Sequence, residues 1–417
     1  MKKIADKNVK QVMSKNMVLI MFAVICIIEI IVAKQPASYL IGEIVTRIFR
    51  NAVLILSLLV PVWAGLGLNF SIVIGAMAAE IGIIVTKNFY LTGVGSLFLS
   101  FLVSIPLAVG FGCLTGKLFN KTKGQEMITG MILGFFAKGL FDLVFMFLCG
   151  PAIPIKNKEL LLTNGIGLIT PITLDKETAG AINNIWMLPL DSFISIVLVC
   201  FLVYLCAKVF IDIIVRKKRI SSKERNRLVG TAIVAAIYFP CLFLFPRFKF
   251  ALSFSDVPVV TGLIILVVCL FISYLAKTKL GSDLLAVGQN KDVAASMGIN
   301  VDKTRITAVI ISTVLAALGQ IIFIQEIGNF ATYNAHENVG TFAIAALLVG
   351  GASIKEADIK QVFIGAFLFH TMFIISPIAG RELFGNAQMG EYFRVFACYA
   401  VITIALVMHS VSERKKA

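Results

Sequence analysis

The residues of this sequence that could do chemistry are a few charged side chains inside long apolar runs. Glu29, Glu80, Lys138 and Asp142 all lie within such runs. A charge inside a bilayer is costly, so residues of this kind usually pair with each other or line a path. Lys138 and Asp142 are four residues apart, which predicts a local ion pair on one helix face. Glu80 has no such neighbour, so a pathway role and a role in helix–helix bonding both stay open, whereas Glu29 is expected near the outer interface.

No arrangement of residues points to catalysis. The three histidines, at positions 336, 370 and 409, are scattered. We expect His370 to be a packed, hydrogen-bonded residue and His336 to lie on an outer loop, without a spacing typical of zinc. The segment "GFGCLTGKL" at 110–118 fails the GxxxxGK[ST] pattern of a phosphate-binding loop. The expectation is therefore a non-catalytic chain without a metal or a cofactor.

The elements that must position these residues are membrane helices. Of the 417 residues, 59% are hydrophobic, and the mean hydropathy is +0.93, which exceeds that of ordinary soluble domains. Apolar runs of about 20 residues recur, the length that spans a bilayer. We predict an all-α polytopic membrane protein with about 10–12 membrane segments. The expected segments are 17–33, 51–68, 70–86, 92–116, 127–149, 190–213, 229–246, 257–276, 306–326, 339–351, 361–379 and 392–410.

The charge distribution predicts the topology. With the N-terminus inside, the inner stretches hold 25 Lys and Arg residues and the outer stretches hold 10. We expect the protein in the plasma membrane of a bacterial cell. Positive charge favours the cytoplasmic side, so both termini and the stretch 277–305 are expected to face the cytoplasm. The stretches 34–50 and 150–189 are expected outside. The basic stretch 216–227 is interpreted as an anchor at anionic lipids or, alternatively, as a contact with a partner.

Two short segments indicate an internal repeat. "NFSIVIGAMAAEIG" starts at Asn69 and "NVGTFAIAALLVGG" starts at Asn338. Each follows one long segment and precedes two more, so that residues 51–149 and 306–410 share one order in opposite orientations. This is typical of an inverted-topology repeat with interrupted helices near the substrate path. We therefore expect a single membrane domain with inserted segments at about 190–246, although chance similarity of small-residue helices is an alternative.

A polar stretch between two apolar segments, "GSDLLAVGQNKDVAASMGINVDKTR" from Gly281 to Arg305, has the signals of a short helix. Asn290 is a suitable N-cap, Asp292 favours a helix start, and Gly298 can end the helix in the left-handed conformation. A capped helix with small surface residues could fit a groove of another protein. The alternative is an amphipathic connecting loop.

This stretch resembles the cytoplasmic coupling loop of permease subunits of ATP-binding-cassette (ABC) importers, in the superfamily for ribose, galactosides, nucleosides and branched-chain amino acids. The residues that carry the resemblance are Gly281, Leu285, Val287, Gly288, Asn290, Ala294, Ala295, Gly298 and Ile299. "AIAALLVGGAS" from Ala343 is similar to the second-half signature of the family, and "GQEMITGMILGFF" from Gly124 resembles a segment of nucleoside-type members. Asn69 stands where the sugar permeases usually have Asp.

The resemblance implies a permease subunit that forms the path for a simple sugar or a nucleoside. The alternatives are a branched-chain amino acid or another small metabolite, or an ion-coupled secondary transporter. The implied partners are ABC ATP-binding subunits, a second permease subunit in a homodimer or heterodimer, an extracytoplasmic substrate-binding protein and the lipid bilayer, but no nucleic acid. The implied coupling residues are Gly288, Asn290, Ala294, Ala295 and Gly298. The implied pathway residues are Asn69, Ser71, Gly75, Glu80, Gln125, Glu126, Asn338, Gly340 and Thr341.

Overall fold

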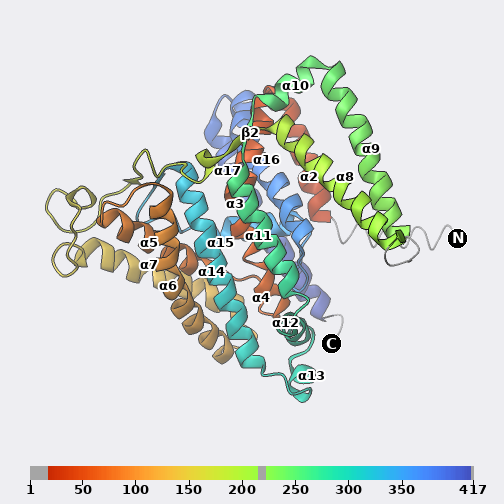
Figure 1. The fold of residues 1–417 in the computed structure, drawn as a ribbon. Coiled ribbons are helices and arrows are strands. Elements are labelled where there is room, and N and C mark those ends of the chain that lie inside the picture. Colours follow the sequence, from red (N-terminus) through yellow and green to blue (C-terminus); the bar gives the residue numbers. More distant parts are fainter. Residues whose placement is uncertain (1–16, 215–221, 415–417) are drawn as a thin grey trace.

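Helices make up most of the computed structural model, which describes residues 17–214 and 222–414 (Figure 1). The α-helices are α2 (Met17–Ala33), α3 (Ala37–Leu56), α4 (Leu59–Trp63), α5 (Ile72–Asn88), α6 (Gly93–Lys121), α7 (Glu126–Leu143), α8 (Leu190–Ile214), α9 (Ser222–Leu244), α10 (Pro246–Ser253), α11 (Val259–Leu275), α12 (Lys279–Gln289), α13 (Lys291–Ser296), α14 (Val301–Ile327), α15 (Val339–Val349), α16 (Ile359–Phe384) and α17 (Ala387–Arg414). The strands are β1 (Ile172–Thr173), β2 (Met187–Pro189), β3 (Asp256–Pro258) and β4 (Asn329–Phe330), and the short helices are η1 (Val144–Leu148), η2 (Lys158–Leu160) and η3 (Asn183–Ile185).

The prediction of an all-α polytopic membrane protein is confirmed, and most of the predicted segments coincide with a helix. The predicted segment 51–68 does not, because it covers the end of α3, the short helix α4 and a non-helical stretch from residue 64 onward. Among the described residues, seven helices are long and apolar enough to cross a membrane, or eight if α11 and α12, which meet at 72°, form one broken span. This number is lower than the predicted 10–12 because α2, α5 and α15 have only 17, 17 and 11 residues, and because α17, with 28 residues, is not among these spans.

The second helix begins earlier than predicted. The stretch 34–50 was expected to be an outer loop, but α3 already starts at Ala37. Its charges are satisfied within the fold, since Arg47 pairs with Glu43 one turn away at 3.6 Å and Arg50 donates to Glu326 of α14 at 2.6 Å. A helix can therefore continue through a stretch that is too polar to score as a membrane segment.

Close packing of α6 on α14 forms one rigid part of the bundle. A Cβ atom on Gly112 would lie 2.9 Å from Cα of Ile310, and one on Gly116 would lie 2.8 Å from Cα of Ile306. Small residues four positions apart let two membrane helices approach to backbone contact. The helix α5 packs against both α6 and α14. The largest apolar core lies beside this part, between α3, α15 and α16.

Helix neighbours have the arrangement that an inverted repeat would produce. The four elements α3, α5, α6 and α7 correspond in order to α14, α15, α16 and α17. In the first set α5 packs on α6 and α14, and in the second set α15 packs on α16 and α3. Likewise α6 packs on α14 and α16 on α3, while α7 contacts α6 and α17 contacts α16. The pairing supports the repeat, which stays a prediction.

Two short antiparallel strand pairs fasten the long connection 150–189 to the bundle. Strand β1 pairs with β4 after α14, and β2 pairs with β3 before α11. The Tyr333 hydroxyl donates to the carbonyl of Leu168 at 2.8 Å. Burial raises the pKa of Tyr333, so its hydroxyl keeps its proton and remains a donor.

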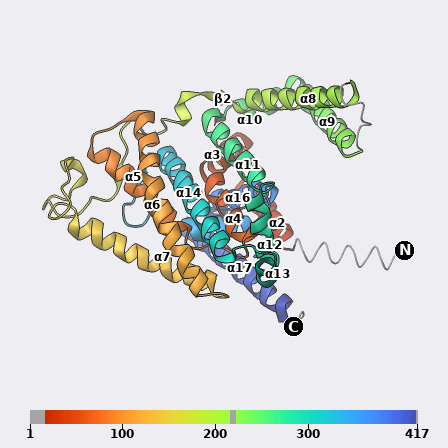
Figure 2. The same cartoon turned by 60° about the horizontal axis from the view of Figure 1, so that its bottom comes forward.

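The inserted segments form a hairpin that projects from the bundle. Figures 1 and 2 show α8 and α9 extending away from the other helices, with α10 and β2 at the attached end. The helix α10 packs on α3, which holds the hairpin at that end. The basic residues at 216–219 lie outside the described residues, so their role as an anchor stays a prediction.

Candidate functional site

A pocket of about 540 Å³ lies where α15 begins, between α5, α7 and α17. Three of the predicted pathway residues, Asn338, Gly340 and Thr341, line it. The other lining residues are Phe70, Val73, Met127, Ile128, Met131, Gly134, Phe135, Lys138, His336, Glu337, Tyr399 and Ile402. Aromatic rings and a few polar groups thus surround one space, which is the usual composition of a small-molecule site.

Glu80 forms a buried polar cluster with two residues that sequence reasoning did not connect to it. Oε2 of Glu80 lies 2.8 Å from Nδ1 of His336, and Gln320 of α14 donates to Oε1 of Glu80 at 3.2 Å. All three side chains are fully buried. His336 lies on the connection between α14 and α15 as expected, but this connection folds inward, so that the imidazole is buried in the wall of the pocket. The sequence signal that could have pointed to such a cluster is Glu80 itself, because a carboxylate inside the membrane needs a polar partner.

The predicted local pair of Lys138 and Asp142 is confirmed. Nζ of Lys138 lies 2.8 Å from Oδ2 of Asp142, and the two side chains are only about one quarter exposed. Lys138 also lines the pocket. The ammonium group of Lys138 therefore lies at the pocket wall, and the carboxylate of Asp142 balances its charge.

The residues at the start of α5 face α14 rather than the pocket. The Asn69 side chain donates to Oγ of Ser312 at 3.2 Å and accepts the hydroxyl hydrogen of Ser71 at 2.5 Å. A Cβ atom on Gly75 would lie 2.5 Å from the carbonyl oxygen of Thr313, so this glycine lets α5 approach α14. These contacts fix the break before α5, and the neighbouring Phe70 reaches the pocket instead.

Gln125 and Glu126 lie at the first turn of α7 and do not line the pocket, although Met127 beside them does. Gln125 is exposed at the helix start. Glu126 is 7% exposed, forms an ion pair with Arg305 of α14 and lies 3.3 Å from Nζ of Lys291. Glu126 thus contacts the stretch that resembles a coupling loop.

The caps predicted for that stretch are confirmed. The Asn290 side chain accepts from the backbone N–H groups of Asp292 and Val293 at 2.9 and 3.1 Å, which starts α13. Gly298 has a φ of +81°, which ends the helix in the left-handed conformation that favours glycine. The stretch is thus a short capped helix following α12.

The outer face of α13 is apolar and uncovered. Val293 is 53% exposed and Met297 is 72% exposed, and Ala295 is exposed between them. Ala294 is buried and faces inward. Gly288 lies inside as well, because a Cβ atom there would lie 2.1 Å from the carbonyl oxygen of Trp63. Of the five predicted coupling residues, Ala295 is therefore the one whose side chain is placed for contact with a partner.

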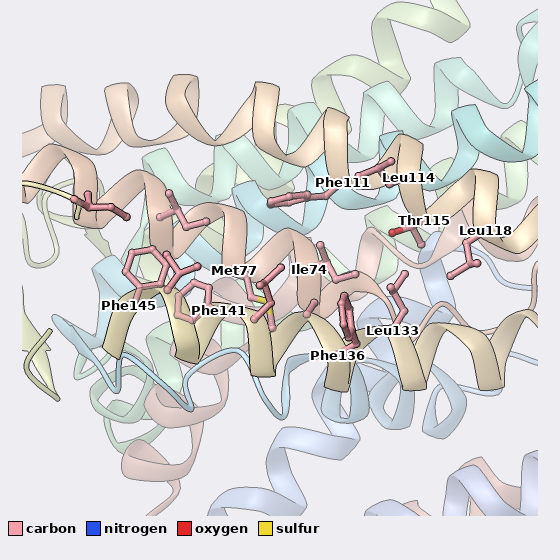
Figure 3. Close-up of a pocket in the computed structure, with 15 residues that line it drawn as sticks. Ile74, Met77, Phe111, Leu114, Thr115, Leu118, Leu133, Phe136, Phe141 and Phe145 are labelled. Atoms are coloured by element: carbon pink, nitrogen blue, oxygen red, sulfur yellow. The ribbon is translucent and has the colours of Figure 1, made fainter. Parts of the chain in front are cut away.

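A second and larger pocket, of about 620 Å³, lies between α5, α6 and α7 (Figure 3). Its lining is apolar except for Thr115. In Figure 3, Phe145 and Phe141 lie toward one end of this space, Met77 and Ile74 lie nearer its middle, and Leu118 lies at the other end. A lining without polar groups suits hydrocarbon better than a sugar or a nucleoside, so the smaller pocket is the better candidate for a polar solute.

The remaining titratable residues lie apart from both pockets or at their margins. Glu29 does not reach the interface as expected, because it is buried and accepts a hydrogen bond from Ser376 at 2.7 Å. His370 is packed beside Phe369 as expected, but its buried Nε2 has no hydrogen-bond partner among the described atoms. The side chain of His409 lies outside the described part. Within the described ranges, no group of His, Cys, Asp and Glu could hold a metal ion.

Comparison with known proteins identifies the family. The sequence profile of the family described as "Branched-chain amino acid transport system / permease component" matches residues 177–406. The chain belongs to this permease family. No solved structure matches the permease.

Several curated proteins match parts of the permease. It is 32% identical over 117 residues to the xylose transport system permease protein XylH of Haemophilus influenzae, which covers 28% of this chain and 30% of that protein. It is 34% identical over 95 residues to the nucleoside ABC transporter permease protein NupB of Lactococcus lactis, covering 22% and 26%. A tyrosine transport system permease protein of Clostridioides difficile is 27% identical over 162 residues, covering 36% and 55%. The permease thus spans less than two thirds of the length of each of these relatives.

Proposed function

We propose that this permease forms the translocation path of an ABC importer for a sugar or a nucleoside. The observation that carries the proposal is the capped helix α13, whose apolar outer face, with Val293 and Met297, is uncovered and could seat in an ATP-binding subunit. Family membership supports the same role. On this proposal α13 and both termini face the cytoplasm, and the long connection 150–189 faces a substrate-binding protein.

The chemistry of the smaller pocket supports a neutral, oxygen-rich solute. A buried ion pair is stable only as an electrically balanced unit. If Glu80 and His336 together carry no net charge, Nε2 of His336 carries a hydrogen, wherever the second proton lies between them. This Nε2 has no hydrogen-bond partner among the described atoms. A hydroxyl or carbonyl oxygen of the solute is the acceptor that such a donor requires, and sugars and nucleosides carry both.

A binding assay followed by uptake tests the proposal. The substrate-binding protein encoded beside this permease is screened with sugars, nucleosides and amino acids in a thermal-shift assay. The ligand that stabilises it is then tested for uptake in cells with and without the permease. We expect a sugar or nucleoside, and uptake that requires both the permease and ATP.

Other outcomes would assign a different role. Stabilisation by a branched-chain or aromatic amino acid would replace the proposed substrate class and keep the importer. Uptake into vesicles that lack ATP-binding subunits, driven by a proton or sodium gradient, would make the chain a secondary transporter instead.

A further inference from the structure

Glu126 lies where three segments of the permease meet. It is the first residue of α7, next to Lys291 at the start of α13 and Arg305 near the start of α14. Its Oε1 lies 3.3 Å from Nζ of Lys291 and pairs with Nη2 of Arg305. Its Oε2 accepts from the backbone N–H of Gly124 at 3.0 Å. One carboxylate therefore joins α7 to the coupling helix and to a membrane helix.

The two ion pairs differ in their exposure. The Arg305 side chain is 0% exposed and that of Glu126 is 8% exposed, whereas that of Lys291 is 34% exposed. Removing one partner of a buried pair leaves a buried charge, so the Arg305 pair is expected to persist. A partly exposed pair is weak and screened by solvent. The Lys291 contact can therefore break and re-form while α7 stays attached to α14.

Beyond Glu126, the helix α7 separates the two pockets. Met127, Met131 and Lys138 line the pocket of about 540 Å³ at the start of α15. Leu133 and Leu140 line the apolar pocket of about 620 Å³. Figures 1 and 2 show α7 leaning away from α6 along its length. Because space lies on both sides, α7 can tilt without forcing densely packed side chains apart.

We propose that Glu126 is a positioning residue through which the coupling helix moves α7. A shift of α13 reaches α7 through the Lys291 contact, with the buried Arg305 pair as the pivot. The tilt of α7 then narrows one pocket and widens the other, which changes access to the pocket at the start of α15. This inference rests on the proposed function, because ATP-binding subunits must supply the shift of α13.

The test measures access to the pocket and needs no substrate. The permease is co-expressed with the ATP-binding subunits of its transporter and carries a Met131→Cys substitution in the pocket wall. A water-soluble maleimide labels this cysteine in membrane vesicles, without nucleotide and with ATP plus vanadate. Labelling of the parent chain is subtracted, because the native sequence has eight cysteines.

Two substitutions break the same contact from opposite ends. Lys291→Glu places two like charges together and leaves the Arg305 pair intact, whereas Glu126→Gln removes the charge from the α7 side and breaks the Arg305 pair as well. Lys291→Arg keeps the contact. Lys303→Glu is the matched control, since it makes the same change of charge at an exposed position of α14 that has no contact with Glu126. Co-purification of the ATP-binding subunits is measured for every variant.

We expect nucleotide to change the labelling rate in the unsubstituted background, in Lys291→Arg and in Lys303→Glu. Lys291→Glu should reduce this change by up to about fivefold, the upper end for one exposed ion pair. Glu126→Gln should reduce it at least as much, because it also removes the Arg305 pair. If nucleotide changes the labelling rate of Glu126→Gln as much as that of the unsubstituted background, the inference is overturned. If Lys291→Glu then also fails to co-purify with the ATP-binding subunits, Lys291 is a residue that docks these subunits. Absence of any nucleotide effect in the unsubstituted background would overturn both this inference and the proposed importer.

Discussion

Oε2 of Glu80 lies 2.8 Å from Nδ1 of His336, although 256 residues separate the two in the sequence. The contact joins the interrupted segment of the first predicted repeat half to the connection that precedes the short helix of the second. Glu80 also accepts from Gln320, so three segments converge on one carboxyl group. The polar centre of the bundle therefore exists only in the folded chain.

Replacement of Glu80 tests whether this centre holds the segments together. Glu80→Ala leaves Nδ1 of His336 and the side-chain amide of Gln320 without their hydrogen-bond partner, and an unsatisfied buried polar group costs about 1–3 kcal/mol. Glu80→Gln keeps an acceptor oxygen at the same position and should cost less. The measurement is the thermal unfolding midpoint of the purified permease in detergent. Equal midpoints for the two variants would show that the hydrogen bond contributes nothing.

Overpacking tests the contact between α6 and α14. Gly112→Leu forces a side chain into a space where a Cβ atom already lies 2.9 Å from Cα of Ile310. Overpacking of this kind costs about 1–3 kcal/mol, so we expect a lower unfolding midpoint and a lower yield of folded protein. Gly110→Leu is the control on the same helix, because nothing lies within 4 Å of a Cβ atom there. If both variants unfold at the same midpoint, the helices are not in backbone contact.

Blocking the pocket at the start of α15 tests the proposed path. Thr341→Trp fills part of a space of about 540 Å³, and we expect it to abolish most of the uptake while the ATP-binding subunits still co-purify. Leu102→Trp adds the same side chain at an exposed position of α6 and should leave uptake unchanged. Normal uptake with Thr341→Trp would place the path elsewhere.

Changes in α13 test its proposed contact with the ATP-binding subunits. Gly298→Val places a β-branched residue at a φ of +81°, and Ala295→Arg adds a long charged side chain to the exposed face. A misfit of about 1–3 kcal/mol should weaken a modest interface, so we expect less co-purified ATPase or less stimulated ATP hydrolysis. Gly298→Asn is the control, since Asn tolerates the left-handed conformation. If ATP hydrolysis is fully stimulated in both test variants, this stretch only connects α11 to α14 and does not contact the ATP-binding subunits.

Cysteine labelling of intact cells tests the orientation. Asn164→Cys lies in the long connection 150–189 and should react with a membrane-impermeant maleimide from outside. Lys291→Cys on α13 should react only after the membrane is opened. The parent chain with its eight cysteines supplies the background. The reverse labelling pattern would invert the proposed topology.

The hydrophobic pattern of the sequence was sufficient to locate the helices, because each membrane helix buries its own backbone hydrogen bonds and must be apolar over its length. The same rule explains the error at 34–50. Arg47 and Arg50 reduce the hydropathy of that stretch, but Glu43 and Glu326 neutralise them in the fold. A pairing with α14 cannot be read from the local composition of α3.

The candidate site was less accessible to sequence reasoning. Asn338 and Thr341 were found because they begin a short helix, a local signal. His336 was missed because its partner is distant in the sequence. Glu126 was assigned to the path because "GQEMITGMILGFF" from Gly124 resembles a segment of nucleoside-type members, whereas its contacts with Lys291 and Arg305 come from α13 and α14.

The length of α15 has a consequence for how the bilayer acts on the permease. Its 11 residues span about 16 Å at 1.5 Å per residue, roughly half of a hydrocarbon core. Residues from Ala343 to Val349 are all buried by neighbouring helices. A thicker or thinner membrane therefore exerts no hydrophobic mismatch on α15 directly. Lipid thickness can reach this helix only through the tilt of the longer helices around it, so lipids of different chain length should alter transport through those helices.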